Sequence, residues 1–279
     1  MSSHKIRNVS RFIQGEETSD GAGVKLKRMI GTSELNFLDP FLLLDEFKNE
    51  NPDDYIAGFP SHPHRGFETV TYLLAGRMRH RDSNGNEGLL TPGAVQWMTA
   101  GKGIIHSEMP EMEDGLIWGY QLWVNLPSSL KMSEPKYQDI PPEEIPVFKS
   151  DGIEVVVIAG SCEGVNGAAN TSIPIYYLDV KLEKNRTFQM EIPQDMNSLI
   201  HMIEGEAWIG TDRVQAKQGD LAVLDSGEFA QIKTDAGARF LLLAARPIEE
   251  PVARGGPFVM NTREEIIQAF RDYESGNFA

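Results

Sequence analysis

Cysteine is almost absent from this chain: Cys162 is its single thiol among 279 residues. An internal disulfide and a metal cluster built on several cysteines are therefore both excluded. A lone thiol in a chain of this size is typical of proteins from a reducing compartment. No redox or metal motif surrounds Cys162, so we interpret it as a small structural residue.

Basic residues and long apolar runs are also scarce. Lysine and arginine number 26 against 41 aspartates and glutamates, which gives a formal net charge of −15. This acidity argues against a general affinity for nucleic acid or for acidic membrane surfaces. Residues 1–13 lack the apolar core of a signal peptide, and runs such as 240–245 are too short to cross a bilayer. We expect a cytoplasmic protein with no membrane partner and no direct nucleic-acid partner.

What the sequence does contain is a series of short β-type runs separated by turns. Thr69–Leu74, Val95–Thr99 and Trp118–Leu126 are rich in β-branched and aromatic residues, and Asn84-Gly85 is a strong hairpin signal. Such spacing is typical of antiparallel sandwiches and barrels. The one clear helical pattern, at residues 261–270, has a capping residue and an apolar face. We predict an all-β fold with a short C-terminal helix.

Two segments of the second half echo the first. Residues 199–205 resemble residues 71–76, and residues 218–223 resemble residues 91–96. We interpret these echoes as the duplication of a β-barrel unit. The segment from Ser128 to Pro146 is rich in proline, glutamate and lysine and is the candidate linker. We therefore predict two domains, residues 1–135 and residues 136–279.

Two short motifs carry potential metal ligands. His62-Pro63-His64 and His106-Ser107-Glu108 each place two ligand types at positions i and i+2, which share one face of a strand. Three imidazoles and a carboxylate that converge would hold one first-row metal, with Fe(II), Mn, Co, Ni, Cu and Zn all suited to the set. If the ion is octahedral, two positions remain for water, dioxygen or a chelating substrate.

Spacing alone leaves the identity of the carboxylate open. His62-x-His64-x3-Glu68 also fits a ligand pattern of β-barrel metalloenzymes, so either Glu68 or Glu108 could bind the metal while the other acts as a base nearby. Glu68 shares a face with His64 only if the strand between them is regular. Pro63 lacks an amide donor, so its strand should begin, bulge or lie at a sheet edge there.

The remaining histidines and the aromatic residues carry weaker predictions. His80 lies among three arginines and is expected to be a solvated strand position, whereas His201 has no partner motif, which predicts a second barrel without metal. Five large residues would be core by default, but some must line a pocket if the first barrel is hollow: Phe59, Phe67, Trp97, Met98 and Trp123. Such a pocket would suit a flat aromatic ligand.

The chain closely resembles the pirin family of the cupin superfamily along nearly its whole length. The resemblance rests on runs of residues spread from the start of the chain to its end: Asp20-Gly21-Ala22-Gly23-Val24, Leu38-Asp39-Pro40-Phe41, His62-Pro63-His64-Arg65-Gly66-Phe67-Glu68-Thr69, Gln96-Trp97-Met98-Thr99-Ala100-Gly101, His106-Ser107-Glu108-Met109-Pro110, Leu122-Trp123-Val124-Asn125-Leu126 and Gly256-Pro257-Phe258-Val259-Met260-Asn261-Thr262. It implies a bicupin, which is a pair of antiparallel β-barrels of the double-stranded β-helix, or jelly-roll, type.

The resemblance also implies a single mononuclear iron, Fe(II), in the N-terminal cupin. Its implied ligands are His62, His64, His106 and Glu108, which leaves Glu68 a supporting role. The C-terminal cupin is expected to lack a metal set.

Family function is divided, and the resemblance implies two hypotheses. Some members, bacterial ones especially, are similar to quercetin 2,3-dioxygenases, oxidoreductases that open the heterocycle of flavonols with O2 and release carbon monoxide. In that reading the flavonol 3-hydroxyl chelates the metal and Glu108 is the catalytic residue that accepts its proton. In the alternative, the protein is an iron- or redox-responsive regulator that binds a transcription factor or metabolic enzyme. We expect a monomer whose partners are a small aromatic substrate and O2.

Overall fold

The computed structural model describes residues 5–112 and 114–278, and these residues are mostly β-strand. The chain divides into two compact units. The first barrel unit contains Glu16–Pro142 and the described residues from Ile248 onward; the second contains the described residues up to Gly15 and Glu143–Pro247. The sequence predicts one boundary, after residue 135. In the structure the two units meet after Pro142, the described N-terminal residues belong to the second barrel unit, and the described C-terminal residues belong to the first.

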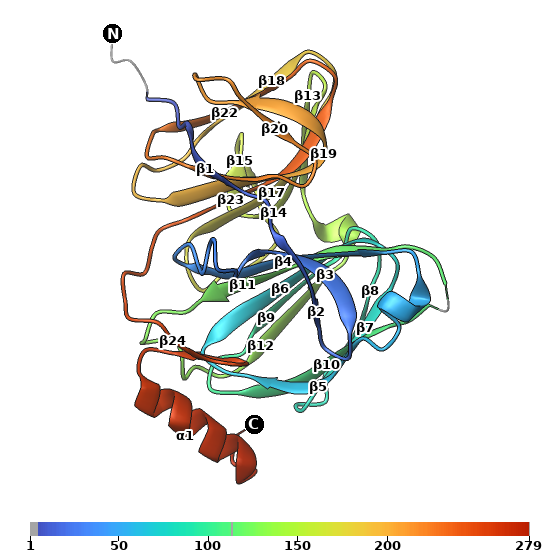
Figure 1. Cartoon of the computed structure of the whole chain (residues 1–279), viewed down its shortest axis with the longest axis vertical. Coiled ribbons are helices and arrows are strands. Elements are labelled where there is room, and N and C mark those ends of the chain that lie inside the picture. The colour runs from blue at the N-terminus through green and yellow to red at the C-terminus, as the bar shows by residue number, and fades with distance from the viewer. Residues whose placement is uncertain (1–4, 113, 279) are drawn as a thin grey trace. The chain divides into compact units, whose positions relative to one another are not determined.

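The first barrel unit contains two antiparallel sheets. Its strands are β2 (Glu16–Asp20), β3 (Val24–Ile30), β4 (Phe41–Asn49), β5 (Phe59–His64), β6 (Phe67–Ala75), β7 (Met78–Asp82), β8 (Glu87–Leu90), β9 (Val95–Thr99), β10 (Ile104–Pro110), β11 (Ile117–Asn125) and β12 (Lys136–Ile140), with a 3-10 turn η1 at Pro52–Asp54. The larger sheet has the order β12-β9-β6-β11-β4-β3-β2, and the smaller has the order β5-β10-β7-β8 (Figure 1).

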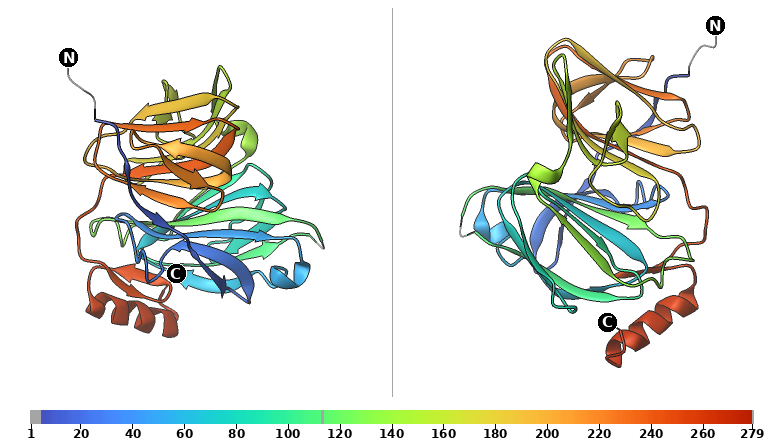
Figure 2. Two further views of the ribbon diagram at one scale, coloured as in Figure 1. Left: turned by 45° about the horizontal axis from the view of Figure 1, so that its top comes forward. Right: turned by 180° about the vertical axis from the view of Figure 1, so that it is seen from behind.

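The second barrel unit repeats this arrangement. Its strands are β1 (Val9–Ile13), β13 (Val147–Ser150), β14 (Ile153–Ala159), β15 (Ser161–Cys162), β16 (Val165–Asn166), β17 (Ile175–Leu182), β18 (Arg186–Glu191), β19 (Asn197–Ile209), β20 (Val214–Lys217), β21 (Leu221–Leu224), β22 (Phe229–Thr234) and β23 (Ala238–Ala245), and a 3-10 turn η2 (Pro142–Glu144) precedes them. The main path is β1-β21-β19-β23-β17-β14-β13, and β18, β22, the end of β19 and β20 form the counterpart of the smaller sheet. In Figure 2 the blue β1 runs beside the yellow and orange strands of this unit. The matching orders confirm the predicted bicupin fold.

The sequence echoes correspond to equivalent backbone contacts. In the first barrel, the Gly93 amide donates to the Leu73 carbonyl at 2.7 Å and the Leu73 amide donates to the Ala94 carbonyl at 3.1 Å. In the second, the Gly219 amide donates to the Met202 carbonyl at 2.8 Å and the Met202 amide donates to the Asp220 carbonyl at 2.9 Å. Leu73 and Met202 thus occupy the same place in the two barrels, as the duplication predicts.

The expected linker from Ser128 to Pro146 is not a linker over most of its length. Lys136–Ile140 forms β12 and pairs with β9, so it closes one edge of the larger sheet of the first barrel. Lys131 is buried, and its ammonium donates to the Gly66 carbonyl at 2.8 Å and the Val259 carbonyl at 2.9 Å. A polar composition suits an edge strand as well as a linker, which is why composition misled here.

The C-terminal segment packs on the first barrel. It consists of β24 (Ala253–Gly255), β25 (Phe258–Met260) and α1 (Arg263–Glu274). Thr262 caps the N-terminus of α1 and forms a capping box with Glu265. Figure 1 shows α1 and β24 beside the first barrel, and Arg65 holds the helix by an ion pair with Asp272 at 2.6 Å. The predicted helix is confirmed. Within the described part of the chain, no helix is long and apolar enough to cross a bilayer.

Candidate metal centre

β5 and β10 bring three histidines together. The strands pair antiparallel, with His106 opposite His62 and Ile104 opposite His64. Because residues i and i+2 share a face, all three rings point to one side, and their ligand nitrogens lie within 4.8 Å of one another. Among the described residues, no other group of three or more His, Cys, Asp or Glu side chains is this close. β5 is an edge strand, as Pro63 predicts, and the pairing shifts register between His106 and Glu108.

Hydrogen bonds to carbonyl groups fix the orientation of two of the rings. His62 Nδ1 lies 2.8 Å from the Pro60 oxygen, and His64 Nδ1 lies 3.3 Å from the Pro257 oxygen. A carbonyl oxygen only accepts, so each Nδ1 carries the proton and each Nε2 keeps its lone pair. The two Nε2 atoms are 3.0 Å apart. Two nitrogens bound to one ion at about 2.1 Å lie about 3 Å apart at a right angle, so this spacing fits a shared cation.

His106 provides the strongest sign that a metal belongs here. Its ring is buried, and neither ring nitrogen has a hydrogen-bond partner among the described residues. An unpaired buried polar group costs about 1–3 kcal/mol, which a bound cation would offset. Burial, followed by the nearby imidazoles, lowers the pKa of His64 and of His106 well below its usual value. Both rings are therefore neutral at pH 7, the form that binds metals.

Glu108 is buried on β10, but its carboxylate is not part of the three-histidine cluster. One oxygen accepts a hydrogen bond from Thr71 Oγ1 at 2.9 Å, and the other accepts from Gln121 Nε2 at 3.0 Å. Gln121 in turn accepts from Trp123 Nε1 at 3.2 Å. This network fixes the carboxylate while leaving it further lone pairs, so ligation by Glu108 stays a prediction that the arrangement permits.

Glu68 lies on the other face of its strand from the groups that contact Glu108. β6 pairs regularly with β9 and β11 from Glu68 to Tyr72, so Glu68 and Thr71 point to opposite faces. Thr99 Oγ1 donates to the Glu68 carboxylate at 2.8 Å. Gly66, with a φ of +87°, separates β5 from β6 and breaks the regular strand that would bring Glu68 to the face of His64. This geometry disfavours Glu68 as a ligand.

The prediction that His80 is a solvated strand position is wrong. Its side chain is fully buried, its Nε2 lies 2.9 Å from Asp139 Oδ2, and its ring stacks on Tyr137 at 5.5 Å. β7 alternates strictly: Met78 and His80 point inward while the arginines between and beside them point outward. The alternation is present in the sequence, but the three neighbouring arginines suggested that the whole strand is exposed to solvent.

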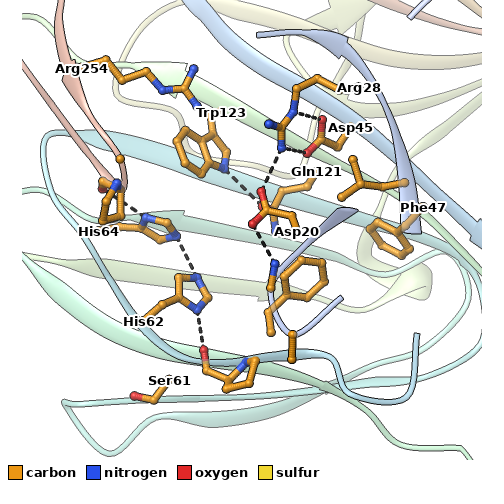
Figure 3. A pocket seen from close by; sticks show the side chains of 17 residues that line it. Asp20, Arg28, Asp45, Phe47, Ser61, His62, His64, Gln121, Trp123 and Arg254 are labelled. Atoms are coloured by element: carbon orange, nitrogen blue, oxygen red, sulfur yellow. Dashed lines mark hydrogen bonds and ion pairs between the residues drawn. The ribbon is translucent and has the colours of Figure 1, made fainter. Parts of the chain in front are cut away.

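A pocket of about 600 Å³ opens beside the histidines (Figure 3). His62 and His64 line one wall, and Phe47, Phe59 and Trp123 supply aromatic surface. Trp123 contacts the His64 ring at 5.1 Å, which joins the aromatic wall to the metal ligands. Of the five large residues predicted as core or lining, Phe59 and Trp123 line the pocket. The other three are buried and do not: Phe67, Trp97 and Met98.

Sequence reasoning missed the charged groups of this pocket. Arg28 forms a two-pronged pair with Asp45, at 2.9 and 2.8 Å, and also reaches Asp20 at 2.9 Å. These hydrogen bonds raise the pKa of Arg28, so its charge is permanent. Arg254 lies over the Trp123 ring at 4.9 Å. The one available signal was Asp45, a charge inside an otherwise apolar strand; Arg254 is far away in sequence and gave none.

Comparison with known proteins places the chain in a family. The family model described as Pirin matches residues 23–124, and the model described as Pirin C-terminal cupin domain matches residues 177–279. The chain belongs to the pirin family. The first match lies within the first barrel unit, the second covers much of the second barrel together with the C-terminal segment, and the two together cover well over half of the chain. The resemblance inferred from the motifs is therefore confirmed.

Individual relatives support the same conclusion. The chain is 49% identical to a pirin-like protein of Caulobacter vibrioides over 98% of this chain and 99% of that protein. It is 46% identical to pirin of Homo sapiens, over 96% and 93%. Among solved structures, the crystal structure of quercetin 2,3-dioxygenase from Acinetobacter baumannii is 35% identical and covers 98% of this chain and 99% of its own, with a TM-score of 0.91.

Proposed function

We propose that this member of the pirin family is a metal-dependent dioxygenase that opens the heterocyclic ring of flavonols such as quercetin with O2. The observation that carries the proposal is the three-histidine cluster, two of whose members, His62 and His64, line an aromatic-walled pocket of about 600 Å³. That volume suits a small aromatic molecule. The likeness to a protein named quercetin 2,3-dioxygenase, at 35% identity over almost the whole chain, supports this choice of substrate.

His62, His64 and His106 would hold one divalent metal, and we propose Glu108 as the fourth ligand and iron(II) as the native ion. Three neutral imidazoles and one carboxylate form a donor set suited to first-row metals, and the unpaired His106 nitrogens fit such an ion. When bound, the metal would act as a Lewis acid that takes the flavonol 3-oxygen and makes the bound flavonolate reactive toward O2.

The protein side chains would bind the flavonol and move one proton. Phe47, Phe59 and Trp123 offer surface on which a flat ring system can lie. Glu108 would accept the 3-hydroxyl proton at a carboxylate oxygen, because Thr71 and Gln121 hold that carboxylate in place. Gln121 also lines the pocket, so it connects the substrate side of the wall to the base.

The expected reaction is balanced by the substrate and O2 alone. Both atoms of O2 are incorporated, the flavonol heterocycle opens, and one ring carbon leaves as carbon monoxide while the remaining carbons form an ester of two phenolic halves. No outside reductant is required.

Anaerobic mixing followed by admission of oxygen tests the proposal. Protein loaded separately with Fe, Mn, Co, Ni or Cu is incubated with quercetin without oxygen, and O2 is then admitted. We expect loss of the flavonol absorbance together with release of one carbon monoxide per quercetin. Absence of turnover with all five metals would refute the dioxygenase function.

The regulatory alternative rests on one specific contact. His64 Nδ1 lies 3.3 Å from the Pro257 carbonyl oxygen, and Pro257 directly precedes β25. A change in metal binding that moves the His64 ring would therefore shift this contact and the C-terminal segment that contains β25 and α1. Under this alternative the protein would bind a transcription factor or metabolic enzyme without turnover. Metal-dependent hydrogen exchange in residues 253–274, in a protein that fails the quercetin test, would favour it.

A further inference from the structure

The two arginines that line the pocket are in different electrostatic states. Arg28 is paired with two carboxylates, Asp45 and Asp20, so its wall carries a net charge of −1. Arg254 has no carboxylate within ion-pair distance among the described residues, and it donates a long hydrogen bond of 3.4 Å to the Leu42 carbonyl. The pocket therefore has an acidic wall and one cation, Arg254, that interacts with Asp45 and Asp20 only through space and forms no direct ion pair with them.

The Trp123 ring lies between Arg254 and the metal ligand His64. Its guanidinium lies over Trp123, and the Trp123 ring meets the His64 ring at 5.1 Å. Figure 3 shows Arg254 above Trp123, with Arg28 and Asp45 on the other side of the indole and the histidines below it. A flat ligand that reaches the histidines with one end and lies along Trp123 would bring its other end close to Arg254.

Charge within the pocket then distinguishes the two ends of such a ligand. The carboxylates of Asp20 and Asp45 would accept hydrogen bonds from phenolic hydroxyls but repel an anion. The guanidinium of Arg254 offers forked donors that match a carboxylate, and no pocket carboxylate occupies them. Arg254 is exposed to solvent, so its attraction for an anion is screened and moderate.

We propose that Arg254 is a specificity-determining residue that favours aromatic chelating substrates with a carboxylate on the ring distant from the metal. The inference rests on the proposed flavonol function and names the substrate class more narrowly. It predicts that the natural substrate is an acidic flavonol or a related hydroxy-ketone rather than a neutral one.

A binding experiment tests this without turnover. The probes are 3-hydroxyflavone and its 4′-carboxylate, and the protein is loaded with zinc, which has no redox chemistry. Dissociation constants come from the fluorescence of the probes at low and high salt. We expect wild type to bind the carboxylate about five- to tenfold more tightly than the neutral probe, with the preference reduced by salt.

Three variants identify the residue responsible. Arg254→Gln should bring the ratio of the two dissociation constants close to one, while Arg254→Lys should keep part of the preference. Arg263→Gln, which removes the same charge from the exposed start of α1, should leave the ratio unchanged.

The outcomes separate this proposal from the proposed function. Equal binding of the two probes by wild type, or an unchanged ratio in Arg254→Gln, overturns the role of Arg254 and leaves flavonol binding intact. Failure of wild type to bind either probe overturns both. A preference that depends on Arg254, in a protein whose five metal forms open neither quercetin nor the 4′-carboxylate probe, supports Arg254 and refutes the dioxygenase.

Discussion

His106 and Glu68 are both buried, yet their surroundings predict opposite results when they are changed. His106 faces two other imidazoles. Glu68 instead accepts a hydrogen bond from Thr99, on the face of β6 opposite to Thr71. We expect His106→Ala to reduce bound metal from one per chain to almost none, and Glu68→Gln to leave most of it bound. Metal analysis after desalting is the measurement. The reverse pattern would show that Glu68 is the ligand and that the present assignment is wrong.

Cys162 should be unreactive in the folded protein. Burial, and secondarily the charge of Glu163, raises the pKa of its thiol to about 11 from a reference of 9.0. At pH 8 the native thiolate is then about a hundredfold scarcer than in the unfolded chain. We predict slow reaction with a disulfide reagent such as DTNB before unfolding and rapid reaction afterward. Equal rates in the two states would contradict the burial of this thiol.

The same pKa shift has a consequence at alkaline pH. The unfolded chain loses the thiol proton near pH 9, while the native protein keeps it until about pH 11. This group therefore leaves the free energy of unfolding unchanged below pH 9 and lowers it as the pH rises toward 11. A Cys162→Ala variant should not show that part of the alkaline decline.

The residues that the sequence could predict are those whose chemistry depends on local spacing. His62, His64 and His106 follow from i, i+2 alternation and the pairing of two strands. His80 has the same alternation, but its burial depends on Asp139 and Tyr137, which come from a strand far along the chain. Arg254 joins the pocket only because the C-terminal segment returns to the first barrel, so no local pattern could reveal it.

The junction between β5 and β6 depends on a glycine. Gly66 has a φ of +87°, and an added Cβ would overlap the Val259 carbonyl oxygen and come within 2.8 Å of Met260 Sδ. Gly85 has a similar φ of +85° but open space around it. We expect Gly85→Ala to cost about 1 kcal/mol of stability, from backbone conformation alone, and Gly66→Ala about 3 kcal/mol or more.

Chemical unfolding of the two glycine variants, with metal content measured in parallel, checks this prediction. Gly66 follows His64 by two residues, so Gly66→Ala should also weaken metal retention, whereas Gly85→Ala should not. Equal losses of stability in the two variants would show that the contact with Val259 is unimportant.

The C-terminal helix is attached to the first barrel by a pH-sensitive ion pair. The hydrogen bond from Arg65, and next that from Gln268, lowers the pKa of Asp272 below its usual value. The unfolded chain therefore takes up this proton more readily, so the pair contributes stability above about pH 4 and loses it as the pH falls further.

We predict that Asp272→Asn lowers the unfolding midpoint at pH 7 by about 2–4 °C, the shift expected for about 1 kcal/mol in a unit of this size. The difference from wild type should shrink below pH 4. Asp212→Asn, an exposed change in the second barrel, serves as the control. A difference that stays constant down to pH 3 would exclude the Asp272 carboxylate as its source.

Elements were predictable where both pairing partners lie close in sequence. The strands, the hairpin turns and α1 follow from periodicity and caps. β12 was mistaken for part of a linker because an exposed edge strand is polar, and β1 gave no sign that it pairs with β21. β1 occupies the same edge position in the second barrel that β12 occupies in the first. Because β1 is far from β21 in the sequence, its own residues could not reveal this pairing.

At the scale of the molecule, the two barrels share a strand order but differ in what their equivalent strands carry. β18 and β22 correspond to β5 and β10, and their facing positions hold buried apolar side chains: Phe188, Met190, Ala230 and Ile232. His201 lies on β19, the counterpart of β6, rather than on a strand equivalent to those with the ligands. Because the equivalent strands of the second barrel carry apolar residues at these positions, we predict one metal per chain, not two.

Metal analysis of protein purified without added metal, and again after reloading and desalting, tests the central claim most directly. We predict one equivalent of a first-row metal per chain in wild type and in His201→Gln, and almost none in the double variant His62→Ala/His64→Ala. Two equivalents in wild type, none after reloading, or one equivalent retained by the double variant would contradict a single metal centre on the histidines of the first barrel.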